Sequence, residues 1–262
     1  MDTEEFNSLQ ARILRNRFIP LPPQSRNQSC SRDTPFLNSG IDLMRVVLAQ
    51  GLAENESLLD LGCGYGRLAL PLTQYLSDNG RYFGVDINLG AVAWCHENIS
   101  QCYTNFEFAV LNARNDHYKN KFEYGTASLR DCELPIPDGR KFEAITAFSL
   151  FTHLLWPEVE WYFKRIKERL APNGRATTSW FLINAEREKS IQDGQATFAF
   201  DLSSQGPAFL LKDTTYSQAI AHSESALFEL AETVGLRIAK PPTYGAWHAG
   251  KPGQDVLTLS LA

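Results

Sequence analysis

The feature that most constrains the fold of this chain is an apolar run that ends in three closely spaced glycines, within residues 58–70. The glycines, Gly62, Gly64 and Gly66, are separated by single residues, and Asp60 stands two positions before the first. Glycine adopts φ > 0 without strain and presents no Cβ to a ligand. The pattern therefore predicts a strand, a tight loop and a helix, with the loop backbone open to a small ligand. A tight turn with no ligand is the alternative.

The spacing of these glycines disfavours a dinucleotide as the ligand. A dinucleotide-binding loop has the pattern Gly-x-Gly-x-x-Gly, which seats a pyrophosphate at the N-terminus of the helix. Here Arg67 occupies the third glycine position of that pattern, and the glycine falls one residue earlier. Asp60 would repel a diphosphate, whereas it would pair well with an ammonium group. Both residues therefore argue against NAD.

Length, composition and charge indicate the class of protein. With 262 residues, of which 44% are hydrophobic and 21% charged, the chain is long enough for one large α/β domain with a cap or lid. Its net charge is −5 and its pI is near 5.6. An acidic chain of this kind is a poor match for a nucleic acid or an anionic membrane. We therefore expect a small-molecule substrate, while the oligomeric state stays open.

The cysteines and the first residues indicate the compartment. The 5 cysteines include no Cys-x-x-Cys pair, so we expect free thiols in a reducing cytoplasm and neither disulfides nor a zinc site. The chain starts with an acidic segment, and no apolar run approaches the length of a membrane span. We therefore expect a cytoplasmic protein with no membrane contact and no metal.

Strand-like and helix-like segments alternate along most of the chain. This alternation predicts an α/β, doubly wound, mostly parallel seven-stranded sheet of Rossmann-like type. The last two strands are joined by a loop without a helical pattern, so we expect the final strand to be antiparallel. The expected strands are residues 57–61, 81–85, 106–111, 142–148, 175–183, 236–240 and 255–261. The expected helices are one from Ser39, closed by Gly51, and those at residues 67–76, 89–99, 157–170 and 224–234.

Two segments depart from this alternation. Residues 1–38 are rich in Pro, Ser and Asn and are interpreted as an N-terminal arm before a domain at residues 39–262. Residues 184–222 are polar without a clear period, which predicts a lid or cap insertion. We expect arm and lid to cover the bound ligand; a surface excursion unrelated to binding is the alternative. We expect the lid to contribute apolar side chains to the wall of a pocket for the substrate, the acceptor pocket. These side chains are Phe198, Phe200 and Phe209.

A second carboxylate, Asp86, ends the second expected strand, and Ile87 follows it. In open α/β sheets, ligands bind at the carboxyl ends of the strands. At that position Asp86 can accept hydrogen bonds from both hydroxyls of a ribose, and Ile87 can cover the face of a purine. The alternative role of Asp86 is to cap the helix that follows.

The motif Asp-x-Gly-x-Gly-x-Gly from Asp60 to Gly66 resembles the first motif of class I S-adenosylmethionine (SAM)-dependent methyltransferases. The resemblance covers residues 36–262. Within them, several segments of the chain are similar to a branch of this family that acts on small molecules and sugars. It implies SAM as the cofactor, and it places Asn112, after the third strand, where the family usually has an Asp for the adenine amino group. A turn role for Asn112 is the alternative. The cofactor-binding residues that we expect are Asp60, Gly62, Gly64, Gly66, Asp86, Ile87, Asn112, Ala113 and Phe148.

The segment after the fourth expected strand, residues 147–153, narrows the choice of methyl acceptor. It contains no Asn-Pro-Pro-Tyr or Asp-Pro-Pro-Tyr, which DNA amino-methyltransferases use to hold a flipped base, and no Asp that would begin a magnesium site. We therefore expect metal-independent methyl transfer to a hydroxyl, less readily an amine, of a small molecule, sugar or natural product. A SAM-binding protein without catalysis, or an NAD oxidoreductase, is the alternative.

Two histidines are candidates for the base that removes the proton of the acceptor. His153 closes the segment just described, where it could instead cap the next helix or brace the cofactor loop. His248 lies in the loop between the last two strands, which the topology places at the cofactor edge. We expect His96, His117 and His222 at the surface. For the tryptophan of the last loop, packing of the hairpin is the alternative to substrate binding. The substrate residues that we expect are Tyr118, Trp247, Gln254 and Asp255.

Overall fold

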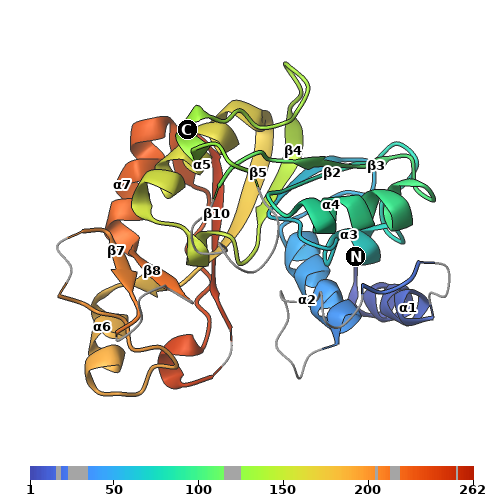
Figure 1. The fold of residues 1–262 in the computed structure, drawn as a ribbon. Helices are drawn as coiled ribbons and strands as arrows, with labels where there is room; N and C mark the ends of the chain where they lie inside the picture. Colours follow the sequence, from blue (N-terminus) through green and yellow to red (C-terminus); the bar gives the residue numbers. More distant parts are fainter. Residues whose placement is uncertain (16–18, 23–34, 115–124, 204–205, 213–218, 252) are drawn as a thin grey trace. The chain divides into compact units, whose positions relative to one another are not determined.

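The computed structural model describes residues 1–15, 19–22, 35–114, 125–203, 206–212, 219–251 and 253–262 (Figure 1). The strands are β1 (Ser57–Leu61), β2 (Arg81–Asp86), β3 (Phe106–Val110), β4 (Phe142–Ala147), β5 (Leu170–Trp180), β6 (Leu182–Ile183), β7 (Ala208–Leu210), β8 (Ile220–Ser223), β9 (Leu236–Ile238) and β10 (Asp255–Leu261). The α-helices are α1 (Thr3–Leu14), α2 (Phe36–Ala49), α3 (Ala69–Leu72), α4 (Leu89–Cys95), α5 (Trp156–Arg169), α6 (Ala185–Gln192) and α7 (Glu224–Val234).

The strands form a seven-stranded sheet, in the order β3-β2-β1-β4-β5-β10-β9, and a three-stranded sheet, in the order β6-β8-β7. In the larger sheet β10 runs antiparallel to both of its neighbours, and the remaining strands are parallel to one another. The predicted fold class is therefore confirmed, including the antiparallel final strand.

The chain divides into two compact units. The first contains residues 1–114, 120–128 and 132–138, and the second contains residues 115–119, 129–131 and 139–262. In the first unit, β1 pairs with β2 and β2 with β3, all in parallel. Helix α2 buries Ile41, Met44 and Val47, which recur at helical spacing on one face. This helix begins at Phe36, three residues before the expected Ser39.

In the second unit, β4 pairs in parallel with β5, and β10 pairs with β5 and β9. The stacked rings of Phe151 and Trp180, 4.1 Å apart, lie in its core. Ser223 is the N-cap of helix α7, and its side chain accepts from the N–H of Ala226. Gly235, in the left-handed conformation, is the C-cap. Strand β5 begins at Leu170, five residues before the expected strand at 175–183, and its register with β4 shifts between Phe142 and Ala144.

The segment expected as a lid is a small subdomain of the second unit with a core of its own. It contains α6, β7 and β8, and its strands pair with β6. Phe200 is fully buried in this core, and Phe198 and Phe209 pack against it. The expectation that Phe200 lines an acceptor pocket is therefore wrong, because its ring is fully buried in this core. For Phe198 and Phe209, which are partly buried, it stays a prediction.

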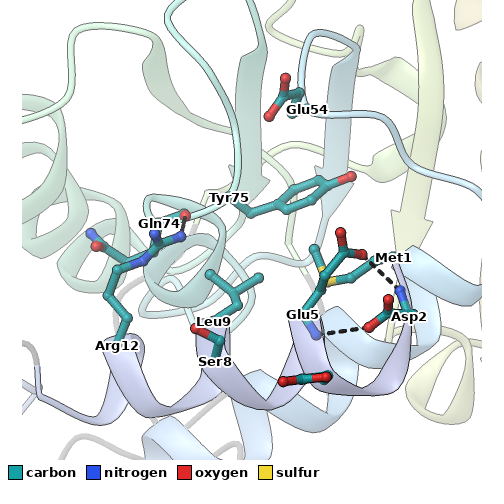
Figure 2. A pocket seen from close by; sticks show the side chains of 10 residues that line it. Met1, Asp2, Glu5, Ser8, Leu9, Arg12, Glu54, Gln74 and Tyr75 are labelled. Carbon is teal, nitrogen blue, oxygen red and sulfur yellow. Dashed lines mark hydrogen bonds between the residues drawn. The ribbon is translucent and has the colours of Figure 1, made fainter.

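Helix α1, in the part of the expected arm that the structure describes, packs within the first unit. The Arg12 guanidinium donates to the carbonyl of Gln74 at 2.8 Å. Between α1 and Tyr75 lies a hollow that Glu54 also lines (Figure 2). Glu54 precedes β1, whereas the glycine loop follows β1. Because α1 shares the hollow with Glu54, α1 lies at the amino end of β1, opposite to the glycine loop. This corrects the expectation that the arm covers the carboxyl end, as far as α1 is concerned.

Candidate functional site

The glycine loop that follows β1 has the conformation that its sequence predicts. Gly62, Gly64 and Gly66 have φ values of 78°, 52° and 72°. The N–H of Gly62 donates to the carbonyl of Val85 at 2.8 Å, which ties the loop to the end of β2. A Cβ at Gly66 would lie 2.7 Å from the side chain of Ile99, whereas a Cβ at Gly64 would meet nothing within 4 Å. Gly66 therefore serves packing, and Gly64 faces space that a ligand can occupy.

Asp86, at the end of β2, holds this loop in place. Its carboxylate accepts from the N–H of Gly64 at 2.7 Å and from the N–H of Asn88 at 2.8 Å. Burial raises the pKa of Asp86, and the backbone donors oppose that shift. The cap of α4 is Asn88, whose side chain accepts from Ala91 at 3.1 Å. Asp86 is thus not the helix cap. The N–H of Ile87 also acts on its carboxylate, and the carboxylate, with about four acceptor sites, keeps room for a further donor.

Asp60 is more deeply buried than the sequence suggested. It is 4% exposed and accepts from the Tyr82 hydroxyl at 2.5 Å. Burial raises the pKa of Tyr82 well above its ordinary value, and the charge of Asp60 adds to this shift, so the phenol stays a neutral donor. Asp60 therefore has a protein partner beneath the loop, which the sequence did not reveal.

Asn112 and Ala113 follow β3 directly, as expected. The side-chain oxygen of Asn112 accepts from the N–H of Thr126 at 3.4 Å, and Ala113 forms an isolated bridge with Ala127. Asn112 is exposed and Ile87, after β2, is half-buried. The structure therefore gives Asn112 a turn contact and leaves its side chain accessible.

In the second unit, a hydrogen-bonded group lies where β4 and β5 end. Phe148, expected at the cofactor, is buried, and the next residue, Ser149, has a left-handed backbone with φ 56°. The N–H of Ser149 donates to Ser179 Oγ at 2.7 Å, and Ser179 Oγ donates to Gln254 Oε1 at 2.6 Å. Sequence reasoning named Gln254 but missed both serines; their only signal is that they stand near strand ends.

The two candidate bases have different surroundings. His153 is half-buried in a 3₁₀ turn, Phe151–His153, and its backbone N–H donates to Leu150 at 3.0 Å. His248 is 23% exposed; its Nδ1 lies 3.0 Å from the carbonyl of Gly245, and its Nε2 lies 3.8 Å from Glu186 Oε1. Since a carbonyl only accepts, Nδ1 of His248 carries the proton and Nε2 is the basic nitrogen.

His222 is the opposite of the surface residue that we expected. It is 0% exposed, on β8, and its Nε2 donates to the carbonyl of Leu154 at 3.1 Å. Its ring lies beside Trp156 and Trp180. Burial lowers its pKa to about 4, so the ring is neutral at pH 7. Of the other two histidines, His96 is exposed as expected.

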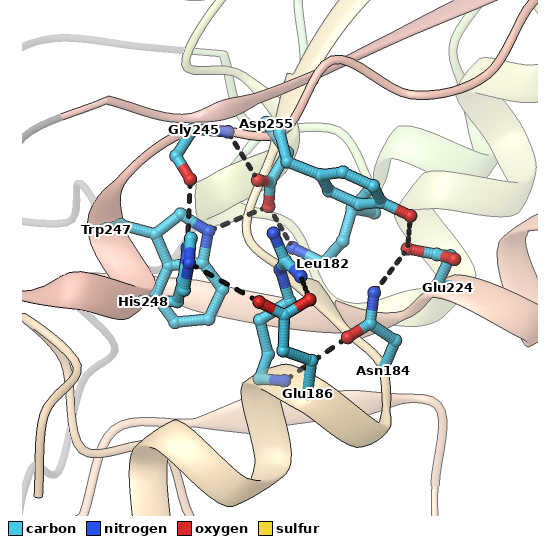
Figure 3. Close-up of polar contacts among 10 residues, drawn as sticks. Leu182, Asn184, Glu186, Glu224, Gly245, Trp247, His248 and Asp255 are labelled. Carbon is cyan, nitrogen blue, oxygen red and sulfur yellow. Dashed lines mark hydrogen bonds and ion pairs between the residues drawn. The ribbon is translucent and has the colours of Figure 1, made fainter.

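Trp247 and Asp255, expected to bind substrate, are used in folding the last loop (Figure 3). Trp247 is 1% exposed and packs against two phenylalanines of the subdomain core. Asp255 is fully buried and accepts from the N–H of Leu182, the N–H of Gly245 and the indole of Trp247, each at 2.8 Å. The expectation that Trp247 binds substrate is therefore corrected, and the packing alternative holds, because its ring is buried in the subdomain core.

Tyr118 and His117 lie outside the described residues, so their expected roles stay predictions. Within the described part of the chain, no group of three His, Cys, Asp or Glu side chains is arranged to hold a metal ion. No helix in that part combines the length and the apolar character needed to cross a membrane.

Comparison with known proteins bears on the class of this chain. The family model of a methyltransferase domain matches residues 59–176, from β1 into β5. The chain is 25% identical over 147 residues to a tRNA1(Val) (adenine(37)-N6)-methyltransferase of Haemophilus influenzae. That match covers 55% of this chain and 60% of the relative, so the chain spans less than two thirds of the relative's length.

Solved structures share the fold. A Pyrococcus horikoshii OT3 protein has a TM-score of 0.55 at 16% identity, with coverage of 88% of this chain and 93% of that one. The magnesium protoporphyrin IX methyltransferase of Synechocystis PCC 6803, solved with S-adenosylhomocysteine (SAH), has a TM-score of 0.54 at 14% identity, with coverage of 99% and 95%. At such identities these likenesses concern the fold alone.

Together the fold, the glycine loop and the family match indicate a methyltransferase domain of the class I, SAM-dependent type at residues 59–176. Residues 59–176 of this chain match the methyltransferase domain, and SAM is the cofactor that such a domain implies. The predicted family and cofactor are confirmed. The residues fit this cofactor, because Gly64 borders open space and the Asp86 carboxylate keeps room for a hydroxyl donor beside its backbone donors.

Proposed function

We propose that this chain transfers the methyl group of SAM to a hydroxyl of a small molecule, sugar or natural product, without a metal ion. The observation that carries the proposal is the hydrogen bond from the Gly64 N–H to the Asp86 carboxylate. It couples the open glycine loop to the acid that would accept from the ribose hydroxyls. We infer that Asp86 and Ile87 hold the nucleoside part, while Asn112 is available to the adenine.

When bound, SAM supplies a methyl group on a positively charged sulfur, so the protein has to align the acceptor and take its proton. His248 is suited to take a proton at Nε2, since the Gly245 carbonyl fixes the proton on Nδ1. Glu186, 3.8 Å from that nitrogen, would then face a cation. His153, half-buried in its 3₁₀ turn, is the other candidate.

A nucleic acid acceptor is the second candidate function, because the relative from Haemophilus influenzae is a tRNA adenine methyltransferase. Two features of this chain favour the small molecule. The segment after β4 lacks the Asn-Pro-Pro-Tyr type of motif for a flipped base, and the net charge is −5. A nucleic acid partner is attracted mainly through phosphate contacts with Lys and Arg.

The test is methyl transfer from tritiated SAM by the purified protein. One set of reactions contains hydroxylated small molecules (phenols and methyl glycosides), and a second contains total bacterial tRNA. We expect label in the first set and none in the tRNA. Label in the tRNA alone would replace the proposal by the second candidate, and no label in either set would favour a SAM-binding protein without catalysis.

A further inference from the structure

Ser149 has an unusual backbone at a place where α/β sheets bind ligands. Among the residues that the structure describes, it is the one non-glycine residue with positive φ, at 56°. Such conformations are strained for residues with a Cβ, and they cluster at functional sites. Ser149 comes two residues after β4, and β4 is parallel to β5, so the carboxyl ends of both strands lie at one edge.

The hydrogen bonds of Ser149 lead to a single side-chain amide. Its N–H donates to Ser179 Oγ, so the hydroxyl proton of Ser179 is directed to its other partner, Gln254 Oε1, at 2.6 Å. The Ser149 hydroxyl donates to the same oxygen at 3.2 Å. Two donors on one oxygen fix which way the amide faces.

The amide nitrogen of Gln254 is left with two N–H groups to donate. Within the described part of the chain it has no acceptor, and Gln254 is half-buried. The residue that follows, Asp255, is held by three donors (Figure 3). The backbone beside Gln254 is therefore anchored, and its amide is an oriented donor at the end of β5.

We propose that Gln254 is the residue that recognises the methyl acceptor, by donating its amide N–H to an oxygen of that molecule. Ser149 and Ser179 are positioning residues that orient the amide. The inference rests on the proposed function and deepens it, because it selects the acceptor class. A hydroxyl oxygen that accepts one hydrogen bond keeps a second lone pair for attack. A neutral amine nitrogen has one lone pair, and a hydrogen bond to it would block attack.

The experiment uses the full chain and the variants Gln254→Glu, Ser179→Ala and Gln192→Glu. Gln254→Glu keeps an oxygen for both serines and removes the donor, so the local fold is preserved. Gln192, exposed at the end of α6, is the matched control. The probes are pairs with one skeleton, phenol with aniline and methyl glucopyranoside with its 2-amino-2-deoxy analogue, assayed with tritiated SAM. SAH affinity is measured for every variant, and the Gln254 amide is followed by nitrogen-15 NMR.

We expect the wild type to methylate the hydroxyl member of a pair. Gln254→Glu should raise the KM for that probe by about tenfold or more, because one hydrogen bond is lost and the new carboxylate repels the acceptor oxygen. Ser179→Ala should raise it less, and SAH affinity should stay unchanged in both. The hydroxyl probe should also shift the Gln254 amide resonance in the SAH complex.

Four results would overturn the inference: an unchanged KM in Gln254→Glu, an equal rise in Gln192→Glu, methylation of the amine members only, or no binding of any hydroxyl probe to the SAH complex. None of these four results depends on whether the protein binds SAM. Loss of SAH binding by the wild type is the separate result that would overturn the proposed function itself.

Discussion

The buried His222 makes the stability of this protein depend on pH in a defined window. In the unfolded chain a histidine titrates near 6.5, whereas burial lowers the pKa of His222 to about 4 in the folded protein. Between these values the unfolded state binds more protons than the folded state. The contribution of His222 is therefore complete above pH 6.5 and is lost as the pH falls toward 4. At 1.36 kcal/mol for each pKa unit, the loss amounts to about 3 kcal/mol.

The assay is urea denaturation at a series of pH values from 7 to 4.5, for the wild type and for His222→Gln. The amide of Gln can replace the Nε2 donor to the Leu154 carbonyl, but it does not titrate. The difference in unfolding free energy between the two proteins should shrink by about 2 kcal/mol or more as the pH falls to 4.5. His96→Gln, at an exposed position, is the control and should follow the wild type. A difference that is the same at every pH would refute the reasoning.

Three further changes test the site. Asp86→Ala should weaken SAH binding by about 1.5–3 kcal/mol in calorimetry, the range for hydrogen bonds to a charged group, while Asp78→Ala at an exposed position should not. Gly66→Ala should lower the free energy of unfolding by about 1–3 kcal/mol, because φ is 72° and the new Cβ would meet a side chain at 2.7 Å; an unchanged denaturation midpoint would contradict this. Removing the true base, by His153→Ala or His248→Ala, should lower turnover about 10²-fold or more with SAH affinity retained; full activity in both would exclude either imidazole.

The sequence predicted well what depends on local pattern. Strands β1 and β10 and helix α7 have the expected bounds. The glycine loop was predictable because three positive φ values need three glycines. The conformation of this loop could therefore be predicted from the spacing of nearby residues alone.

What the sequence could not give depends on contacts between distant segments. The apolar run at residues 175–183 looks like one strand, yet it breaks after Trp180, and Leu182 joins a second sheet. His222 looks polar, but its partner, Leu154, is 68 residues away. The Ser149–Gln254 bond spans 105 residues, so nothing local indicates it.

The central claim is that the glycine loop and Asp86 bind a SAM-type nucleoside and no dinucleotide. Isothermal titration of the wild-type protein with SAH, and separately with NAD, tests it most directly. We predict saturable one-to-one binding of SAH and no heat of binding with NAD. Binding of NAD without binding of SAH would contradict it.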